Sequence, residues 1–330
     1  MKSSKATASA FGWDFQSNAA IILMLRNIKR ATEVKVEGEN EDIEIKSEDK
    51  YLLMSQVKAV MDPQDFTNVK QKLKKGLQTL SDAAKTLEVE KLVYVTNSPN
   101  PFNNKETMYM FSSPLNLIPF SELPDSCKQT INNICFDKNY ELDTNLLMIC
   151  VIQFYGEDTV ERYKVLLSNT IEFLNSIKAT NISAGELLEY WQHSFYINAS
   201  QKTAVITKKS MIWPIIVLTC DANDNDSYLE DYDKNDTTEI LENYKTIINL
   251  YTERFEFVSL IISDFIDFKG ELNSRENVKK FISEKWYNYK DYFDLRDLDQ
   301  TILKAIIRLI ISKILNCRNV IQNIKKEVNL

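Results

Sequence analysis

The residues best suited to chemistry in this chain lie close together near its start: Asp42, followed by Gln56, Val57 and Lys58. Gln56 and Lys58 are two positions apart in an extended segment, so their side chains share one face. A carboxylate is a hard oxygen ligand for Mg²⁺, and the Gln56 amide and the Val57 main-chain carbonyl would add neutral ligands. Lys58 would hold or deprotonate a water, or neutralise charge that develops on a phosphate. The spacing favours metal-assisted hydrolysis of a phosphodiester.

Three short segments must position these groups. Residues 33–37 and 42–46 alternate between apolar and polar side chains, and the turn-like link Gly38–Glu41 between them predicts a hairpin. Residues 51–60 are more continuously apolar, which predicts a more central strand. If these strands pair, Asp42, Gln56 and Lys58 converge at one edge of a sheet. On its own the same spacing also fits a solvated hairpin with exposed charges.

The rest of the chain alternates between strands and helices before helices dominate. Periodicity predicts helices over 14–30, 65–87 and 159–177, and strands over 91–96 and 146–155. Beyond residue 183, short strands are expected at 203–206 and 213–219, and long helices at 238–268, 276–292 and 298 to near the C-terminus. We therefore predict an α+β protein with a domain at 1–178, built as a mixed central sheet flanked by helices, followed by a mostly helical domain at 179–330.

Composition removes several classes of function. The single histidine, His193, excludes His-rich metal sites, and the six scattered glycines form no phosphate-binding loop, so ATP would have to be used by a partner. The five cysteines form no Cys-x-x-Cys pair and predict free thiols. The net charge of −7 argues against nonspecific coating of nucleic acid, and residues 1–100 are closer to neutral than the remainder.

No targeting or membrane segment is expected. The first residues lack the apolar run of a signal peptide, the stretch 19–25 is too short to cross a bilayer, and 305–315 carries Arg308 and Lys313. These features predict a cytoplasmic protein that does not enter a membrane.

The N-terminal region resembles the PD-(D/E)xK double-strand DNA endonuclease domain of bacterial antiphage effectors. That domain occurs in nucleotide-triggered CBASS effectors, in Lamassu-type systems with an SMC-like ATPase, and beside HerA-like ATPases. The resemblance is strong over residues 10–100 and fainter beyond. It rests on four runs: Phe11-Gly12-Trp13-Asp14-Phe15-Gln16, Val36-Glu37, Glu41-Asp42-Ile43-Glu44-Ile45 and Gln56-Val57-Lys58.

The resemblance implies a restriction-endonuclease-like core and assigns roles to individual residues. Asp42 would be the metal ligand, with Mg²⁺ or Mn²⁺ as cofactor, Gln56 the second motif position and Lys58 the catalytic lysine. Glu37 and Gln16 would support the same site. Glu37 would restore the negative charge that is missing at Gln56. Gln16 would reach the metal or the scissile phosphate, or else would make only a capping or packing contact.

The acidic pair Glu41-Asp42 leaves a choice of ligand. Asp42 is preferred because it shares a strand face with Glu44 while Ile43 points to the core. Four lysines on the following helix suit contacts with a DNA backbone, although a lysine-rich face is also routine on exposed helices; they are Lys70, Lys72, Lys74 and Lys75.

The implied function is cleavage of double-stranded DNA by a defence effector that is restrained by an SMC-like or HerA-like ATPase or by oligomerisation. Wide apolar stripes on the C-terminal helices favour a homo-oligomer. The alternative is a catalytically silent nuclease fold that serves as an adaptor in an ATPase complex. The acidic segment 221–236 is expected to be a solvated loop, or else a DNA mimic that shields the site; it lacks the glycine and glutamate of a calcium loop.

Overall fold

The computed structural model describes residues 5–201, 203–222, 226, 228–230, 232–249, 254–268, 274–293 and 298–330. The chain forms two compact units. The first comprises Met1–Phe173 and Ser183–Lys208, and the second Leu174–Ile182 and Lys209–Leu330. This division differs from the predicted boundary between residues 178 and 179, because 183–208 belongs with the first unit.

Two elements tie that returning segment to the first unit. Helix α6 (Ala184–Ala199) packs on α1 (Lys5–Asn27). The short strand β7 (Ile206–Thr207) then pairs with β1 (Glu33–Val36) and adds an edge strand to the sheet. Sequence periodicity shows where the chain turns helical, but it does not show which later segment returns to the sheet.

A seven-stranded mixed sheet forms the centre of the first unit, in the order β5-β6-β4-β3-β2-β1-β7. Strands β3, β4 and β6 are parallel, and the other pairs are antiparallel. The parallel strands are nearly continuous apolar runs, as expected where both faces are covered. The remaining strands are β2 (Ile43–Lys46), β3 (Tyr51–Lys58), β4 (Leu92–Thr96), β5 (Leu115–Pro119) and β6 (Leu147–Ile152).

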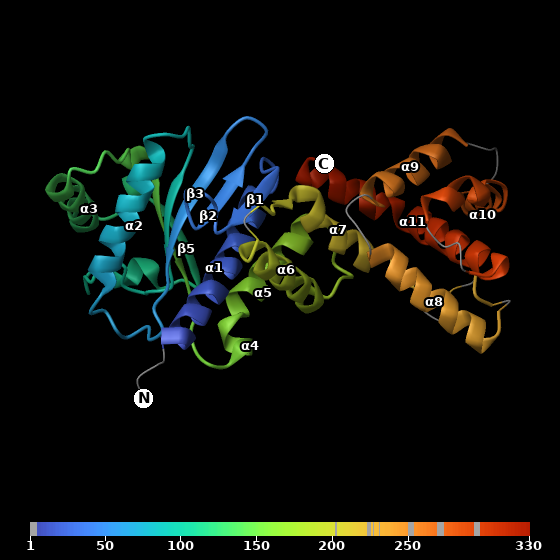
Figure 1. Cartoon of the computed structure of the whole chain (residues 1–330), viewed down its shortest axis with the longest axis horizontal. Coiled ribbons are helices and arrows are strands. Elements are labelled where there is room, and N and C mark those ends of the chain that lie inside the picture. Colours follow the sequence, from blue (N-terminus) through green and yellow to red (C-terminus); the bar gives the residue numbers. More distant parts are fainter. Residues whose placement is uncertain are drawn as a thin grey trace. The chain divides into compact units, whose positions relative to one another are not determined.

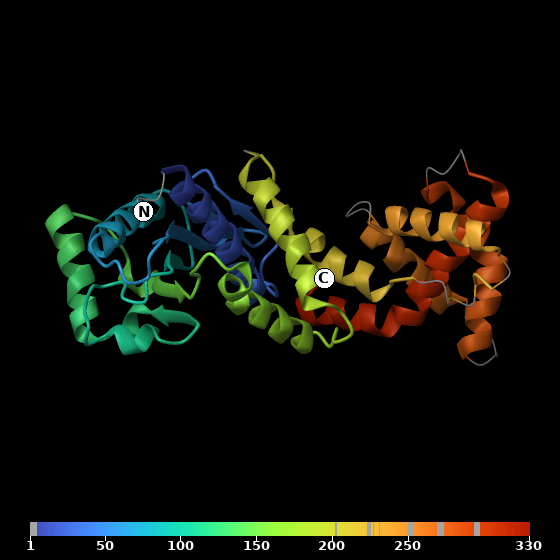
Figure 2. The same cartoon turned by 90° about the horizontal axis from the view of Figure 1, so that it is seen from below.

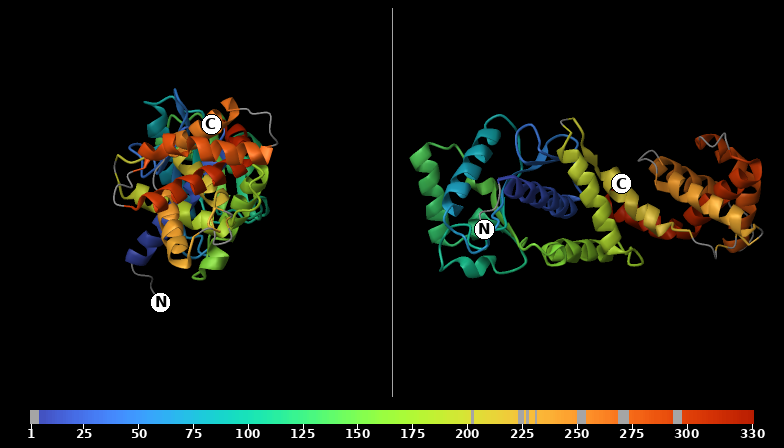
Figure 3. Two further views of the ribbon diagram at one scale, coloured as in Figure 1. Left: turned by 90° about the vertical axis from the view of Figure 1, so that its right-hand side faces the viewer. Right: turned by 60° about the horizontal axis from the view of Figure 1, so that its bottom comes forward.

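Helices cover both faces of this sheet, which makes the unit a three-layer α+β structure (Figures 1 and 3). On one face, α2 (Val69–Ala84) and α3 (Asp125–Lys138) enclose a core with the strands. On the other, α1 lies against β1 and β2. Helix α2 contributes to this core because its apolar residues recur at helical spacing and form one stripe. The core residues include Met54, Leu73, Leu77, Leu80, Tyr94, Cys127 and Ile149.

The predicted hairpin and central strand are confirmed. β1 and β2 pair antiparallel, and β3 lies between β2 and β4. Strand β5 and helix α3 were not predicted. Short 3₁₀ turns flank them at Met108–Phe111, Phe120–Glu122 and Thr144–Leu146. The helix expected over 159–177 divides at Tyr163 into α4 (Thr159–Arg162) and α5 (Lys164–Ser176).

The strand predicted at 213–219 is wrong, because this segment is the second half of helix α7 (Lys208–Thr219). Met211, Ile212, Ile215 and Ile216 are all buried, so apolar side chains cover more than one side of the helix. A continuous apolar run of this kind has neither period two nor period 3.6, and burial alone cannot separate a strand from a buried helix. Of the strand expected at 203–206, only Ile206 is extended, in β7.

The second unit is helical, as predicted. Its long helix α11 (Gln300–Val328) packs with α8, α9, α10 and a 3₁₀ helix (Figure 2). The expected helix over 238–268 is described as two, and residues 250–253 between them lie outside the described residues. The one expected over 276–292 changes to 3₁₀ geometry after residue 285. The bounds are α8 Lys234–Asn249, α9 Arg254–Asp267, α10 Ser274–Lys285 and the 3₁₀ helix Trp286–Tyr292.

The apolar stripe of α11 is largely core. Residues along it, such as Ile306, Ile310 and Ile314, are fully buried within the chain. In the acidic segment 221–236, residues 223–225, 227 and 231 lie outside the described residues. Asp226 forms an ion pair with Lys313 of α11 at 2.9 Å, so this carboxylate is held within the second unit.

Candidate active site

The strand register brings the predicted residues together. Ile43 of β2 is paired with Ser55 of β3, so Asp42, one residue before β2, comes opposite Gln56. Side chains alternate along β3, and Gln56 and Lys58 therefore share the face of Met54, which packs under α2. The three groups meet because two antiparallel strands run in register.

One carboxylate oxygen is the centre of the arrangement. Asp42 Oδ2 accepts hydrogen bonds from Gln56 Nε2 and, at 2.7 Å, from the Val57 main-chain N–H. The Lys58 ammonium lies 3.6 Å from the same oxygen. The side chains of Lys58 and Asp42 keep 28% and 24% of their surface exposed, so a substrate in solution can reach both.

Gln16 and Glu37 lie at the main chain of Asp42. The Asp42 carbonyl accepts a hydrogen bond from Gln16 Nε2 at 2.9 Å and another from the Glu37 main-chain N–H at 2.9 Å. Gln16 is buried on α1, whereas the Glu37 side chain is exposed and its φ is 52°. Both residues therefore fix the peptide that carries the Asp42 carboxylate.

Glu41, the acid of the pair that was not preferred as the metal ligand, is also close to Asp42 and Lys58. Glu41 is only 4% exposed, and neither of its carboxylate oxygens has a hydrogen-bond partner among the described residues. Burial raises the pKa of Glu41 to about 8, the Asp42 charge adds to the rise, and the Lys58 charge opposes it. A buried carboxyl without a hydrogen bond is costly and calls for a specific explanation.

Glu44, on the same hairpin, shows what a satisfied carboxylate looks like. Its Oε1 accepts hydrogen bonds from the main-chain N–H of Asn40 at 2.7 Å and of Glu41 at 3.2 Å. A Cβ on Gly38 would lie 2.3 Å from the Glu44 carboxyl carbon, so a larger residue there would displace the Glu44 side chain. Glu44 holds the hairpin turn together, which leaves Glu41 as the available acid.

Helix α2 supplies the wall above Gln56. Thr79 Oγ1 donates to Gln56 Oε1, while Gln56 Nε2 donates to Asp42, so the amide orientation is set from both sides. Gly76 lies against Tyr94: a Cβ there would be 2.5 Å from the ring and 3.5 Å from Gln56 Cγ. Sequence reasoning missed Thr79 and Gly76, although a glycine inside a helix is itself a signal of close approach.

The four lysines of α2 do not form one surface. Lys72 Nζ donates to the Ala59 carbonyl, and burial together with the Lys58 charge lowers the pKa of Lys72, opposed by Asp65. Lys74 lies near Lys138 of α3, and its pKa is lowered by partial burial and by that lysine. Only the other two, Lys70 and Lys75, are exposed.

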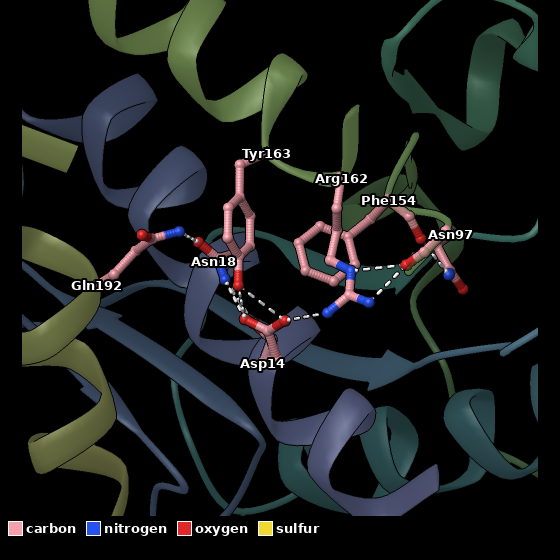
Figure 4. A network of polar contacts seen from close by, with 8 residues as sticks. Asp14, Asn18, Asn97, Phe154, Arg162, Tyr163 and Gln192 are labelled. Atoms are coloured by element: carbon pink, nitrogen blue, oxygen red, sulfur yellow. Dashed lines mark hydrogen bonds and ion pairs between the residues drawn. The ribbon is translucent and has the colours of Figure 1, made fainter. Parts of the chain in front are cut away.

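A second polar cluster lies on α1, centred on Asp14 (Figure 4). Both oxygens of Asp14 accept from the Tyr163 hydroxyl at 3.1 Å, and they also accept from Arg162 Nη1 at 3.1 Å and Asn18 Nδ2 at 2.8 Å. Asn18 in turn accepts from Gln192 of α6 at 2.8 Å. Burial raises the pKa of Asp14, while the bonds from Tyr163, Arg162 and Asn18 oppose that rise.

Arg162 extends this cluster toward the end of β6. Its Nε donates to the Gly156 carbonyl at 2.9 Å, and its guanidinium lies 5.3 Å from the Phe11 ring centre and 5.8 Å from that of Phe154. Asn97, after β4, donates to the Phe154 carbonyl at 2.8 Å (Figure 4). The Asp14 cluster is thus fully satisfied and joins α1, α6 and the segment after β6.

Scans against protein-family models, the curated proteins and the solved structures found no match for this chain. Among the described residues, no three His, Cys, Asp or Glu side chains are grouped to hold a metal ion. Glu41 and Asp42 are two acids, and the further ligands expected, the Gln56 amide oxygen and the Val57 carbonyl, are neutral. The Gln56 oxygen accepts a hydrogen bond from Thr79, and its Nε2, not its oxygen, faces Asp42. No described helix is both long and apolar enough to cross a bilayer.

Proposed function

We propose that this chain is a metal-dependent endonuclease that cuts double-stranded DNA in the cytoplasm as the effector of an antiphage defence system. The observation that carries the proposal is the meeting of Asp42, Gln56, Val57 and Lys58 near the buried carboxyl of Glu41, which has no hydrogen-bond partner among the described residues. It supports the resemblance to restriction-type nucleases, because the strand register puts the residues of the motif side by side.

The residues present fit a divalent cation. Asp42 and Glu41 would hold Mg²⁺ or Mn²⁺, together with the Val57 carbonyl, because hard cations prefer oxygen ligands. Such an ion would supply Lewis-acid charge to the scissile phosphate. A cation would also explain why Glu41 is buried without a hydrogen bond, since its charge favours the ionised carboxylate.

The remaining side chains have separate tasks. Lys58, held beside Asp42, would orient the attacking water or stabilise charge on the phosphate. Gln56 is fixed by Thr79 and orients the Asp42 carboxylate. Because Gln56 is neutral, the site carries less negative charge than one with an acid at this motif position. The Asp42 peptide is anchored by Gln16 and Glu37. These groups are held on strands and helices, which gives the precision that a reactive site needs.

Regulation and assembly form part of the same proposal. One such site cuts one strand, so cleavage of both strands would use a homo-oligomer. A nuclease that acts on any DNA would damage its host, and restraint by an SMC-like or HerA-like ATPase partner is therefore expected.

Supercoiled-plasmid cleavage with Mg²⁺ or Mn²⁺ tests the proposal, comparing wild type with Lys58→Ala. Removal of the catalytic lysine should slow nicking by about a hundredfold or more. Lys46→Ala is the matched control, because Lys46 lies on the neighbouring strand in a partly exposed ion pair with Glu33. Equal cleavage by wild type and Lys58→Ala would place the activity elsewhere. If the wild type neither cuts nor binds Mn²⁺, the silent-adaptor alternative holds.

A further inference from the structure

Two cysteines of the helical unit, distant in sequence, are neighbours in the structure. Cys220 follows the last residue of α7, and Cys317 lies on α11. The Cys317 thiol donates a hydrogen bond to the carbonyl of Thr219, the residue before Cys220, at 3.2 Å, and the two thiols also interact with each other. The spacing of cysteines along the chain gave no sign of this pair.

The two thiols differ in access and in charge. Cys220 is fully buried, whereas Cys317 is only half-buried. The hydrogen bond from Cys220 lowers the pKa of Cys317, the Lys313 charge acts in the same direction, and burial opposes both. The same hydrogen bond, together with burial, raises the pKa of Cys220. Cys317 is therefore both the more exposed residue of the pair and the one whose ionisation is favoured.

The surrounding groups hold this arrangement in place. Lys313 lies one turn before Cys317 on α11 and is ion-paired with Asp226 at 2.9 Å. The Tyr244 hydroxyl of α8 donates to the Cys220 carbonyl, which fixes the main chain at the end of α7. The pair therefore lies where α7, α8 and α11 meet within one unit.

We propose that Cys317 and Cys220 are a peroxide-reactive thiol pair that closes to a disulfide between the end of α7 and α11. Such reactive cysteines are partly exposed, near a positive charge, and next to a second thiol. The modification is independent of the nuclease proposal, because it uses no residue of that site.

The chemistry balances with hydrogen peroxide as the oxidant. The Cys317 sulfur attacks peroxide, an S–O bond forms and the O–O bond breaks, which gives a sulfenic acid and, with one proton, water. The Cys220 sulfur then attacks the Cys317 sulfur. An S–S bond forms, the S–O bond breaks, and the released hydroxide takes the Cys220 proton as a second water. Two thiols lose two electrons to one peroxide, and a dithiol reductant reverses the step.

Cys135 offers a matched control. It is half-buried like Cys317, but burial raises its pKa, so it should remain a thiol. In the Cys220→Ser variant, the serine hydroxyl can still donate to the Cys317 sulfur, but it cannot resolve a sulfenic acid on Cys317. Dimedone should then label Cys317 about tenfold or more faster than Cys135.

The test treats the full chain at neutral pH with hydrogen peroxide, alkylates the free thiols and maps peptides by mass spectrometry. Wild type and Cys135→Ser should yield a cross-linked Cys220–Cys317 peptide that dithiothreitol removes, and Cys317→Ser should yield none. Absence of that peptide from folded wild-type protein would overturn the proposal. Equal dimedone labelling of Cys135 and Cys317 in the Cys220→Ser variant would also overturn it.

Discussion

The two polar clusters of the first unit contain carboxyl groups, half-buried Asp14 and buried Glu41, whose pKa values are both raised by burial, yet they are built in opposite ways. Asp14 accepts hydrogen bonds from Tyr163, Arg162 and Asn18. Glu41 is buried more deeply, and its oxygens have no hydrogen-bond partner among the described residues. A satisfied cluster rigidifies the fold, whereas an unsatisfied one is expected where a ligand or reaction supplies the missing partner.

The largest contrast is expected between Asp42→Asn and Asp14→Asn. Asp42→Asn removes the charge at the centre of the candidate active site, and plasmid cleavage should fall by about a thousandfold while the melting temperature changes little. Asp14→Asn should lower the stability and leave plasmid cleavage nearly unchanged, because it leaves Arg162 half-buried without its carboxylate. Its loss of stability should be about 2 kcal/mol, measured by urea unfolding.

An Asp14→Asn protein that is inactive although folded would contradict this division. So would an Asp42→Asn protein that cuts at the wild-type rate.

The pH dependence of stability should come from Glu41. Its folded pKa of about 8 lies above the ordinary 4.5, so the folded state binds more protons and stability falls as pH rises between these values. Between pH 5 and 8 the wild type should lose on the order of 3 kcal/mol relative to Glu41→Gln, which stays neutral. Urea unfolding of the metal-free proteins at both pH values measures the difference. Parallel curves for the two proteins would show that Glu41 does not titrate in this range.

Metal affinity should separate Glu41 from Glu37, the exposed acid of the same hairpin. Glu41→Gln should weaken Mn²⁺ binding about tenfold in titration calorimetry, because one anionic ligand is lost. Glu37→Gln is the control and should bind nearly as wild type, since only its main-chain N–H contacts Asp42. If the two variants lose the same affinity, general electrostatics rather than coordination is responsible.

The smallest effect is expected on the surface of α2. The double variant Lys70→Ala/Lys75→Ala should weaken binding to duplex DNA about threefold and make it less dependent on salt, because exposed lysines contribute through released counterions. Fluorescence anisotropy at several salt concentrations measures both changes. Lys164→Ala, also on an exposed lysine of this unit, should change neither. An unchanged salt slope in the double variant would remove α2 from the DNA surface.

Local patterns predicted much of the first unit. Alternating side chains predicted β1 and β2, a more continuously apolar run predicted β3, and the apolar stripe at helical spacing predicted α2. Pairing of the predicted strands was enough to expect Asp42, Gln56 and Lys58 at one place, as the structure has them. Prediction was weakest where a segment depends on distant partners: β5 pairs only with β6, and α7 is helical although its sequence has no helical period.

The sequence by itself determined which residues share a strand face, because side-chain direction follows from the period of the backbone alone. It also determined the supply of acids and lysines near Asp42. Only the tertiary structure decided that Glu41 is buried with no hydrogen-bond partner in the described part of the chain, that Thr79 orients Gln56, and that Cys220 lies beside Cys317. Burial and long-range proximity depend on how separate segments pack against one another, and no local pattern encodes that packing.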